Sequence, residues 1–347
     1  MPHIINNFIP LGGQHCITNS LKQIFAFNGY PISEEMLFGI GQGLAFVYVN
    51  LAQSPLISGR IKPFDFETNI ASSLNISLKC KQTKKINTAT EKLKLALKNN
   101  LPIMLYADMA YLKYLNLDEN NHFGGHSIVV FGLDEEKNFF YISDRDSNTQ
   151  KILTPKGYIG NDFHLLSFEE LELARSSNHR PYPANNKWLE FDFSRATKIT
   201  AKNITQAILN TVDAMLNPPA KLLGINGILK FSQEIKKWQS FDKNKLKLAG
   251  ITNYFMINAN GGTGGGAFRK MYGNFLIAAA DLLAIKKLED FGEEFIKIAK
   301  KWDLVADKLK LLYEIGEIKL LEELSYMIKQ IYNDELQSLN KLKDQFQ

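Results

Sequence analysis

Cysteine is scarce in this sequence of 347 residues, which contains only Cys16 and Cys80. Two cysteines can form at most one disulfide, and this excludes the disulfide frameworks that hold small secreted domains together. A single cysteine in an intracellular enzyme is a candidate nucleophile when histidine and Asp or Asn partners occur elsewhere in the chain. Cys80 lies in NISLKCKQT, where apolar and polar residues alternate as in a strand, so we interpret it as structural. Cys16 is therefore the candidate nucleophile.

Long apolar runs are also absent. No uninterrupted stretch approaches the ~20 residues that a membrane span needs, so none is expected. The N-terminal MPHIINNFIPLGG lacks the basic start, apolar core and small-residue cleavage site of a secretory signal, which predicts a cytoplasmic location. Charge of one sign does not dominate, because the chain has 41 basic and 36 acidic residues. The basic residues are spread through helical segments. A nucleic-acid partner is therefore not indicated.

What the sequence does contain is a cysteine at the start of an amphipathic helix, in GGQHCITNSL. Four apolar residues follow it at the spacing of one buried helix face: Ile17, Leu21, Ile24 and Phe25. This spacing predicts a helix from Cys16 to Asn28, which Gly29 ends as a left-handed residue. The positive end of a helix lowers the pKa of a thiol, and its N–H groups can hold a developing oxyanion. The position of Cys16 thus favours a thiolate nucleophile.

A β-hairpin supplies candidate partners for the thiol. The runs SIVVFGLD and FFYISD, joined by EEKN, predict two antiparallel strands. His126 precedes the first strand and Asp144 lies at the end of the second, so both lie at the open end of the hairpin. Asp144 can therefore orient His126 as a base for Cys16. The sequence does not supply the packing of the Cys16 helix against this hairpin.

Three other residues compete for these roles. His15 is a possible base, although neighbouring residues at a helix start point in different directions, and we expect it to line the pocket. His122 is a second possible base, in the loop before the first strand of the hairpin. Asp146 is the rival of Asp144 as the carboxylate that orients the base.

The second half of the chain is predicted to be helical. From about residue 197 onward, long stretches with helical periodicity dominate, and the proline-containing SSNHRPYPANNK is a plausible linker before them. We therefore predict an α+β domain over residues 1–195, with a small antiparallel sheet, and an all-α domain over residues 196–347 that covers or flanks the active site.

A glycine cluster interrupts the predicted helices, in NANGGTGGGAFRKMYGNF. Its glycines could simply connect two helices. Alternatively, backbone N–H groups at the start of the next helix could attract phosphate or carboxylate, because glycine allows a close backbone approach. The candidate substrate-binding residues are Gly262, Gly264, Gly265 and Arg269.

At these motifs the chain resembles known proteins. The order of a helix with a leading cysteine, then KLKLALKNNLPIMLYA, then HSIVVFGLDEEKNFFYISD is similar to that of papain-like, bacteriocin-processing-type cysteine peptidases. More specifically, GGQHCITNSLKQIFAFNGYPISEEMLFGIGQGLAFVY resembles the N-terminal domain of the butirosin-biosynthesis acyltransferase family. GGTGGGAFRKMYGNFL resembles the helical domain that accompanies it. The resemblance spans nearly the whole chain and implies a papain-like catalytic domain.

The resemblance also implies a reaction. Cys16 would be the acyl-accepting nucleophile, His126 the base and Asp144 the residue that orients it. The family transfers an aminoacyl group from an acyl carrier protein thioester to an amine of an aminoglycoside. One departure concerns the oxyanion glutamine of papain-like peptidases, because Pro10 stands several residues before the cysteine and the nearest glutamine is Gln14. Gln14 is thus a weaker candidate donor than the Cys16 N–H.

These observations predict a cysteine-dependent acyltransferase with a thioester donor, a small amine acceptor and an acyl-enzyme intermediate. No metal or organic cofactor is expected. Two alternatives remain open at this point: a cysteine peptidase or amidase with the same triad, and a catalytically silent papain-like protein that binds a ligand.

Overall fold

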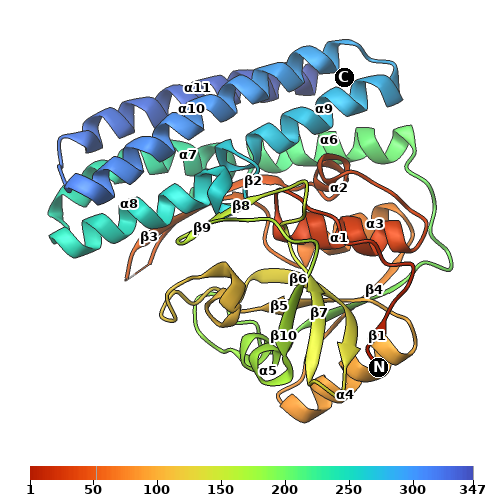
Figure 1. Cartoon of the computed structure of the whole chain (residues 1–347). Helices are drawn as coiled ribbons and strands as arrows, with labels where there is room; N and C mark the ends of the chain where they lie inside the picture. The colour runs from red at the N-terminus through yellow and green to blue at the C-terminus, as the bar shows by residue number, and fades with distance from the viewer. Residues whose placement is uncertain (52, 347) are drawn as a thin grey trace. The chain divides into compact units, whose positions relative to one another are not determined.

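The computed structural model describes residues 1–51 and 53–346 of the chain, drawn in Figure 1. Contacts within the chain define two compact units. The first unit comprises Met1–Leu37 and Leu74–Lys198. The second comprises Phe38–Ser73 and the chain from Ile199 onward.

This division differs from the two continuous parts that the sequence suggested, because Phe38–Ser73 groups with the C-terminal helices. Aromatic packing explains the difference. Phe38 stacks on Phe268 with ring centroids 5.5 Å apart. Phe46 stacks on Trp302 at 5.6 Å. The segment therefore buries its aromatic side chains in the core of the second unit, although it lies near the N-terminus in the sequence.

The first unit is built on a seven-stranded sheet in the order β10-β7-β6-β5-β11-β4, with β1 paired to β6. Its strands are β1 (His3–Ile4), β4 (Ser77–Lys81), β5 (Ile103–Ala107), β6 (His126–Asp134), β7 (Phe139–Ser143), β10 (His164–Ser167) and β11 (Trp188–Asp192). All of these pairings are antiparallel. A separate small ribbon joins β8 (Ile152–Thr154) to β9 (Gly157–Ile159). The predicted antiparallel sheet is confirmed.

Three helices pack on this sheet: α1 (Cys16–Phe27), α4 (Ile86–Lys98) and α5 (Phe168–Ser176). Two single 3₁₀ turns, Met109–Tyr111 and Lys113–Leu115, follow β5. Helix α1 contacts β5 and β6, and α4 and α5 also contact the sheet. The helix predicted to begin at Cys16 is confirmed, and Gly29 after its end has φ = 84°.

The predicted hairpin is formed by β6 and β7 (Figure 1), and an irregularity in it decides which side chains share a face. Near the turn, Leu133 pairs with Phe140, but beyond a bulge between Val130 and Gly132 the register moves by one residue, and Val129 pairs with Ser143. Continued by one residue, this register sets Asp144 opposite position 128, two residues from His126. Because side chains alternate between faces, the bulge brings His126 and Asp144 to the same face.

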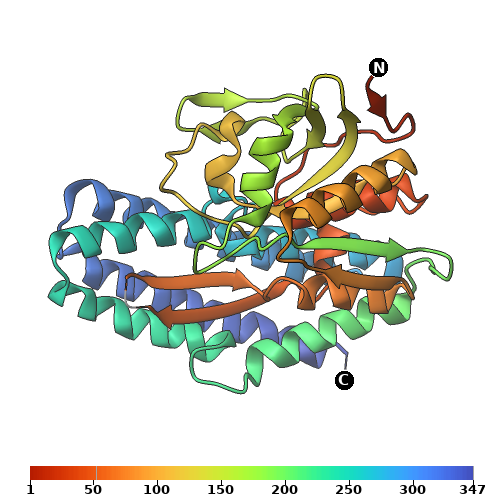
Figure 2. The ribbon, with the colours of Figure 1, turned by 90° about the horizontal axis from the view of Figure 1, so that it is seen from below.

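The second unit contains six helices after residue 199: α6 (Ala201–Leu216), α7 (Gly224–Glu234), α8 (Lys243–Ile257), α9 (Arg269–Leu283), α10 (Lys287–Ile315) and α11 (Leu320–Asp344). Short 3₁₀ turns occur at Ile235–Ser240, Ala259–Gly261 and Gly266–Phe268. The prediction of a helical C-terminal region is confirmed. The early segment adds α3 (Asp65–Ser73) and a hairpin of β2 (Leu44–Asn50) and β3 (Pro55–Arg60), which lies along α7 and α8 (Figure 2). Helix α2 (Glu34–Ile40) connects the units along the chain.

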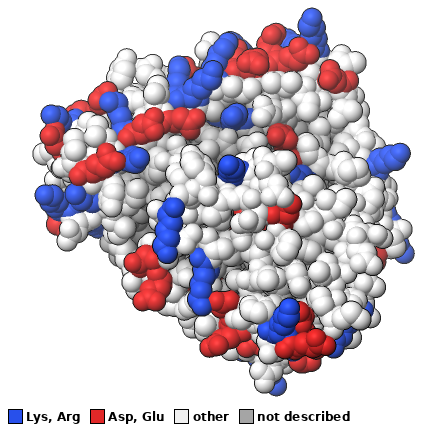
Figure 3. Space-filling model, in the orientation of Figure 1, with Lys and Arg blue, Asp and Glu red and all other residues white. Residues whose placement is uncertain are grey.

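Two properties of the described residues bear on the expected environment. None of their helices combines the length and the apolar character that a membrane crossing requires. On the face shown in Figure 3, basic and acidic side chains are interspersed rather than gathered by sign. This distribution agrees with the near balance of charge in the sequence.

Candidate active site at the start of helix α1

Cys16 is the first residue of α1, and His15 caps this helix. The His15 backbone is extended, and its Nδ1 accepts a hydrogen bond from the Thr18 N–H at 3.4 Å. His15 therefore stabilises the helix start that presents the thiol. Cys16 itself is 9% exposed.

Glu34 of α2 holds the loop that leads into Cys16. Its carboxylate accepts hydrogen bonds from the N–H groups of Gln14 at 2.9 Å and His15 at 3.2 Å, and from the Thr18 hydroxyl at 2.7 Å. A Cβ at Gly13 would lie 2.5 Å from both Glu34 Oε2 and Asn19 Oδ1, so an alanine there would displace these side chains. A buried carboxylate at the positive end of α1 is also electrostatically favourable.

His126 and Asp144 form a buried pair beside the thiol. His126 Nε2 lies 2.8 Å from Asp144 Oδ2, and each residue is 2% exposed. The His126 side chain also hydrogen-bonds to Cys16. Because Asp144 occupies Nε2, Nδ1 is the ring nitrogen that remains for the sulfur. The structure thus brings together the three residues expected from the sequence.

The electrostatics of this cluster favour a thiolate next to an imidazolium. Burial raises the pKa of the Cys16 thiol, but His126, the charge of Arg145 and the Ser127 N–H together lower this pKa to about 7. Burial lowers the pKa of His126, but Asp144 and Cys16 outweigh it and raise this pKa to about 10. Asp144 keeps its charge, because His126, Arg145 and Tyr114 overcome burial and hold its pKa at about 2.

Sequence reasoning did not identify the groups that fix Asp144. The Tyr114 hydroxyl donates to Asp144 Oδ2 at 2.7 Å, and the Arg145 N–H donates to Oδ1 at 2.7 Å. The Asn19 side-chain amide donates to the Asp144 carbonyl at 2.7 Å. Of these groups, only Asn19 had a signal in the sequence, because it lies three residues after Cys16 on the same helix.

The competing residues have other partners. Asp146 pairs with His164 Nε2 at 2.9 Å, and His122 Nδ1 lies 2.9 Å from Asp108 Oδ2. These two histidine–aspartate pairs are distinct from the one at Cys16. Within the part of the chain that the structure describes, no group of three or more His, Cys, Asp or Glu side chains is placed to hold a metal ion.

Gln14 lies two residues before Cys16, as a half-buried residue of the same loop. Its carbonyl accepts a hydrogen bond from Arg145 Nη1 at 3.2 Å, while its N–H donates to Glu34. These contacts fix its backbone. Its role as an oxyanion donor stays a prediction.

The glycine cluster belongs to the second unit and forms a left-handed turn. Gly262, Gly264 and Gly265 all have positive φ. The Gly266 N–H donates to Asp303 Oδ1 at 2.8 Å, and a Cβ there would lie 2.4 Å from the Ala299 Cα, so the glycine permits close contact with α10.

Arg269, the cation expected to support this loop, is fully buried. It forms an ion pair with Glu335 at 2.8 Å and donates to the carbonyls of Ala45, Gly59 and Ala267. These bonds join the β2–β3 hairpin to the helices, which gives Arg269 a structural role. An anion-binding role of the glycines stays a prediction.

The fold and the site define a two-unit protein of mixed α and β structure with a buried cysteine, histidine and aspartate in contact. Residues 15–145 match the family model described as Butirosin biosynthesis protein H, N-terminal, which supports the family that the sequence resembles. Residues 169–342 match the model described as Domain of unknown function (DUF4872). The second match spans half of the chain, and the chain belongs to the family that this domain defines. No curated protein matches this chain.

Proposed function

We propose that this protein is a cysteine-dependent acyltransferase of secondary-metabolite biosynthesis. The observation that supports this most strongly is the contact of Cys16 with His126, itself paired to Asp144. The match at residues 15–145 includes all three residues, and its description names a biosynthesis protein. We further propose that the first unit is papain-like, since a cysteine at a helix start faces a histidine on an antiparallel sheet.

In the first half-reaction, the Cys16 thiolate attacks the carbonyl carbon of a thioester, which a carrier protein holds. A new C–S bond forms, and the carbonyl oxygen becomes an oxyanion that the Cys16 N–H, and in our proposal Gln14, stabilises. Collapse of this intermediate breaks the C–S bond to the donor. The departing thiolate takes the proton of the His126 imidazolium, which leaves an acyl group on Cys16 and neutral His126.

In the second half-reaction, an amine attacks the acyl carbon and His126 takes a proton from its nitrogen. The C–S bond to Cys16 breaks, the amide product leaves, and thiolate and imidazolium are restored. Asp144 holds the imidazole in place and stabilises its charge throughout. Water in place of the amine would give hydrolysis, so the reaction outcome depends on the acceptor.

The test is intact-mass measurement after incubation with an aminoacyl thioester of N-acetylcysteamine. We expect an acyl adduct on the wild type and on Cys80→Ala, but none on Cys16→Ala. Cys80 is a matched control because its thiol is exposed on β4. An adduct that Cys80→Ala abolishes, or no adduct in any variant, contradicts the proposal.

The fate of the adduct separates transfer from hydrolysis. Addition of an aminoglycoside amine should discharge the acyl-enzyme to an amide that mass spectrometry detects. If only the free acid forms at every amine concentration, the protein is a hydrolase with the same site.

A further inference from the structure

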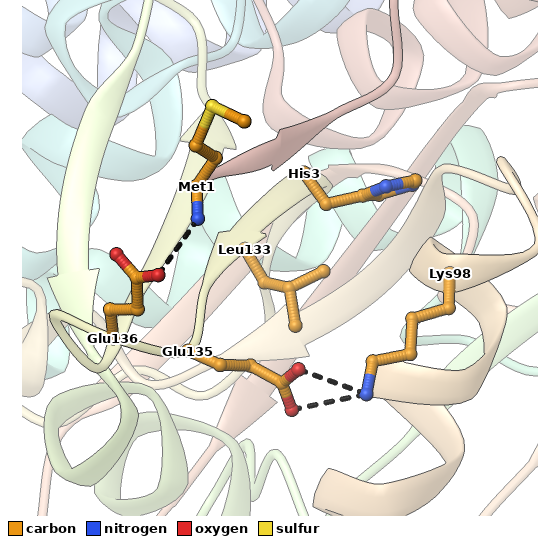
Figure 4. A pocket seen from close by; sticks show the side chains of 6 residues that line it. All are labelled: Met1, His3, Lys98, Leu133, Glu135 and Glu136. Atoms are coloured by element: carbon orange, nitrogen blue, oxygen red, sulfur yellow. Dashed lines mark hydrogen bonds and ion pairs between the residues drawn. The ribbon is translucent and has the colours of Figure 1, made fainter.

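Two cavities of the first unit lie outside the Cys16 site. The first, of about 280 Å³, is lined by Met1, His3 and Lys98 among others (Figure 4). Its charges are paired with each other: the Met1 ammonium lies 3.0 Å from Glu136, and Lys98 lies 2.9 Å from Glu135. It therefore presents no uncompensated charge to a ligand.

The second cavity, of about 310 Å³, lies between α4, the strands β5 and β11, and α5. Its floor is apolar, since Leu93, Ile103 and Trp188 line it and each is less than 9% exposed. Leu95 and Leu101 line its rim and are 61% and 53% exposed. The cavity is therefore a hydrophobic recess that solvent can enter. It shares no residue with the Cys16 site.

Arg175 of α5 also lines this recess, although it is only 2% exposed. Its Nη1 donates to the Ala89 carbonyl at 3.1 Å, but its Nε has no hydrogen-bond partner among the described residues. Burial lowers the pKa of Arg175 to about 10, although the negative charge of Glu172 acts to raise it. A buried guanidinium without an ion-paired carboxylate is destabilising, and an anion in the recess would compensate it.

The two carboxylates near Arg175 have other partners. Glu172 accepts the Thr90 hydroxyl at 2.7 Å. Glu190 lines the recess, but it accepts the Trp188 indole N–H at 2.9 Å and lies 4.0 Å from Lys81. A second cation, Lys92, lines the recess with its Nζ 5.5 Å from the centre of the Trp188 ring. The lining residues thus carry more positive than negative charge.

We propose that this recess binds a compact organic carboxylate, whose head group pairs with Arg175 and whose apolar body lies on Leu93, Ile103 and Trp188. The volume is near the lower end of about 300–1,000 Å³ that small-molecule sites occupy, which suits a small amphiphile. A guanidinium recognises a carboxylate through parallel hydrogen bonds, and the Nε of Arg175 is a donor that has no partner among the described residues. The proposal is independent of the reaction at Cys16.

The experiment is calorimetric titration of the full chain with octanoate, phenylacetate and the neutral octanamide. We expect saturable binding of at least one carboxylate at submillimolar concentration, with octanamide at least tenfold weaker than octanoate if octanoate binds. Arg175→Met should weaken carboxylate binding at least tenfold. Its melting temperature should stay at or above that of the wild type, because the change removes an unpaired buried charge. The control Arg195→Met alters an exposed arginine and should bind as the wild type does.

A second variant keeps the test valid if Arg175→Met does not fold. Ala96 lines the recess from α4 and is half-buried, so Ala96→Phe should fill the space and abolish binding. The bound carboxylate should also raise the melting temperature of the wild type but not that of the folded variants. No saturable binding of either carboxylate below 1 mM, or equal affinities in the wild type and the recess variants, overturns the proposal.

Discussion

Asp144 lies where four polar groups meet. Its carboxylate accepts from His126, from the Tyr114 hydroxyl and from the Arg145 N–H, while its carbonyl accepts from Asn19. The three bonds to the carboxylate restrict it, the bond from Asn19 holds its backbone, and the carboxylate in turn restricts the imidazole. We therefore expect the reactivity of the thiol to depend on residues that do not touch it.

The first prediction concerns the charge of Asp144. In the wild type, alkylation of Cys16 by iodoacetamide should rise through pH 7, where the thiol loses its proton. Asp144→Asn removes the charge that raises the pKa of His126, so the imidazolium is lost at lower pH and the thiolate loses its counter-charge. The alkylation midpoint should therefore move up toward 9.0, the ordinary value of the thiol.

A surface carboxylate provides the control for this titration. Asp192→Asn, at the exposed end of β11, should leave the midpoint where it is in the wild type. A midpoint that Asp144→Asn does not move would show that Asp144 does not stabilise the charged form of His126.

The second prediction concerns Tyr114, which we regard as a positioning residue. Tyr114→Phe removes one hydrogen bond to the carboxylate, so we expect kcat for acyl transfer to fall about 5- to 10-fold, the loss of ~1–1.5 kcal/mol typical of one such bond, with KM unchanged. The basic limb of the pH–rate profile should move to higher pH, because Asp144 then shares its negative charge only with His126 and the Arg145 N–H. Tyr158→Phe, at an exposed tyrosine of β9, is the control. Identical profiles for both variants would contradict the positioning role.

At the scale of elements, the start of α1 and the bulge in β6 decide where the thiol and its partners lie. Glu34 collects the donors of the loop before α1, and Gly13 allows the close approach of Glu34 and Asn19. The bulge between Val130 and Gly132 sets the face on which Asp144 lies. Both features act through backbone geometry.

The third prediction compares the glycines that lie before and after helix α1. Gly13→Ala should displace the loop before Cys16, lower the iodoacetamide rate at pH 7 and destabilise the protein by about 1–3 kcal/mol, as overpacking does. Gly29→Ala, after the other end of α1, meets no atom within 4 Å but requires φ = 84°. It should reduce stability by about 1 kcal/mol, the steric penalty of the left-handed region, and leave the alkylation rate unchanged. Equal alkylation rates in both variants would show that Gly13 does not control the position of the thiol.

The sequence predicted much at this scale, and its omissions have a physical cause. Helical spacing after Cys16 and the turn EEKN were sufficient for α1 and for the β6–β7 hairpin. An antiparallel hairpin also places residues 126 and 144 at one end. The bulge was not predicted, although Gly132 lies at its edge and a glycine inside a strand can mark a bulge. Tyr114 was missed because it reaches Asp144 from a 3₁₀ turn 30 residues earlier in the sequence.

At the scale of the whole molecule, the second unit is assembled from two distant parts of the chain, Phe38–Ser73 and the helices after Ile199. Periodicity identified the helices but not the early segment, since only tertiary contacts show that Phe46 packs on Trp302. Arg269 was expected to face a ligand because charge near glycines is typical of anion sites. Instead, it forms an ion pair with Glu335, which lies 66 residues later in the sequence. Local sequence patterns carry no information about a partner at that separation.

The fourth prediction tests that ion pair. Glu335→Gln leaves the Arg269 guanidinium buried without a counter-charge, so the free energy of unfolding should fall by about 3–5 kcal/mol. Glu323→Gln, on the same helix, breaks the ion pair of an exposed carboxylate with half-buried Lys308 and should cost less than about 1 kcal/mol. Denaturant unfolding measures both values. Similar losses in the two variants would mean that the buried pair contributes no more than an exposed one.

The second unit is built from two separate parts of the chain, and this sets the order in which it can form during synthesis. The ribosome releases the β2–β3 hairpin, with Leu44, Phe46 and Tyr48 on its apolar face, long before it makes the helices that bury them. The first unit has all its strands once residue 192 has been translated, whereas the hairpin must wait for α7 and α8 and for Trp302 of α10. A nascent chain halted before α6 should therefore bind chaperones that recognise exposed apolar strands.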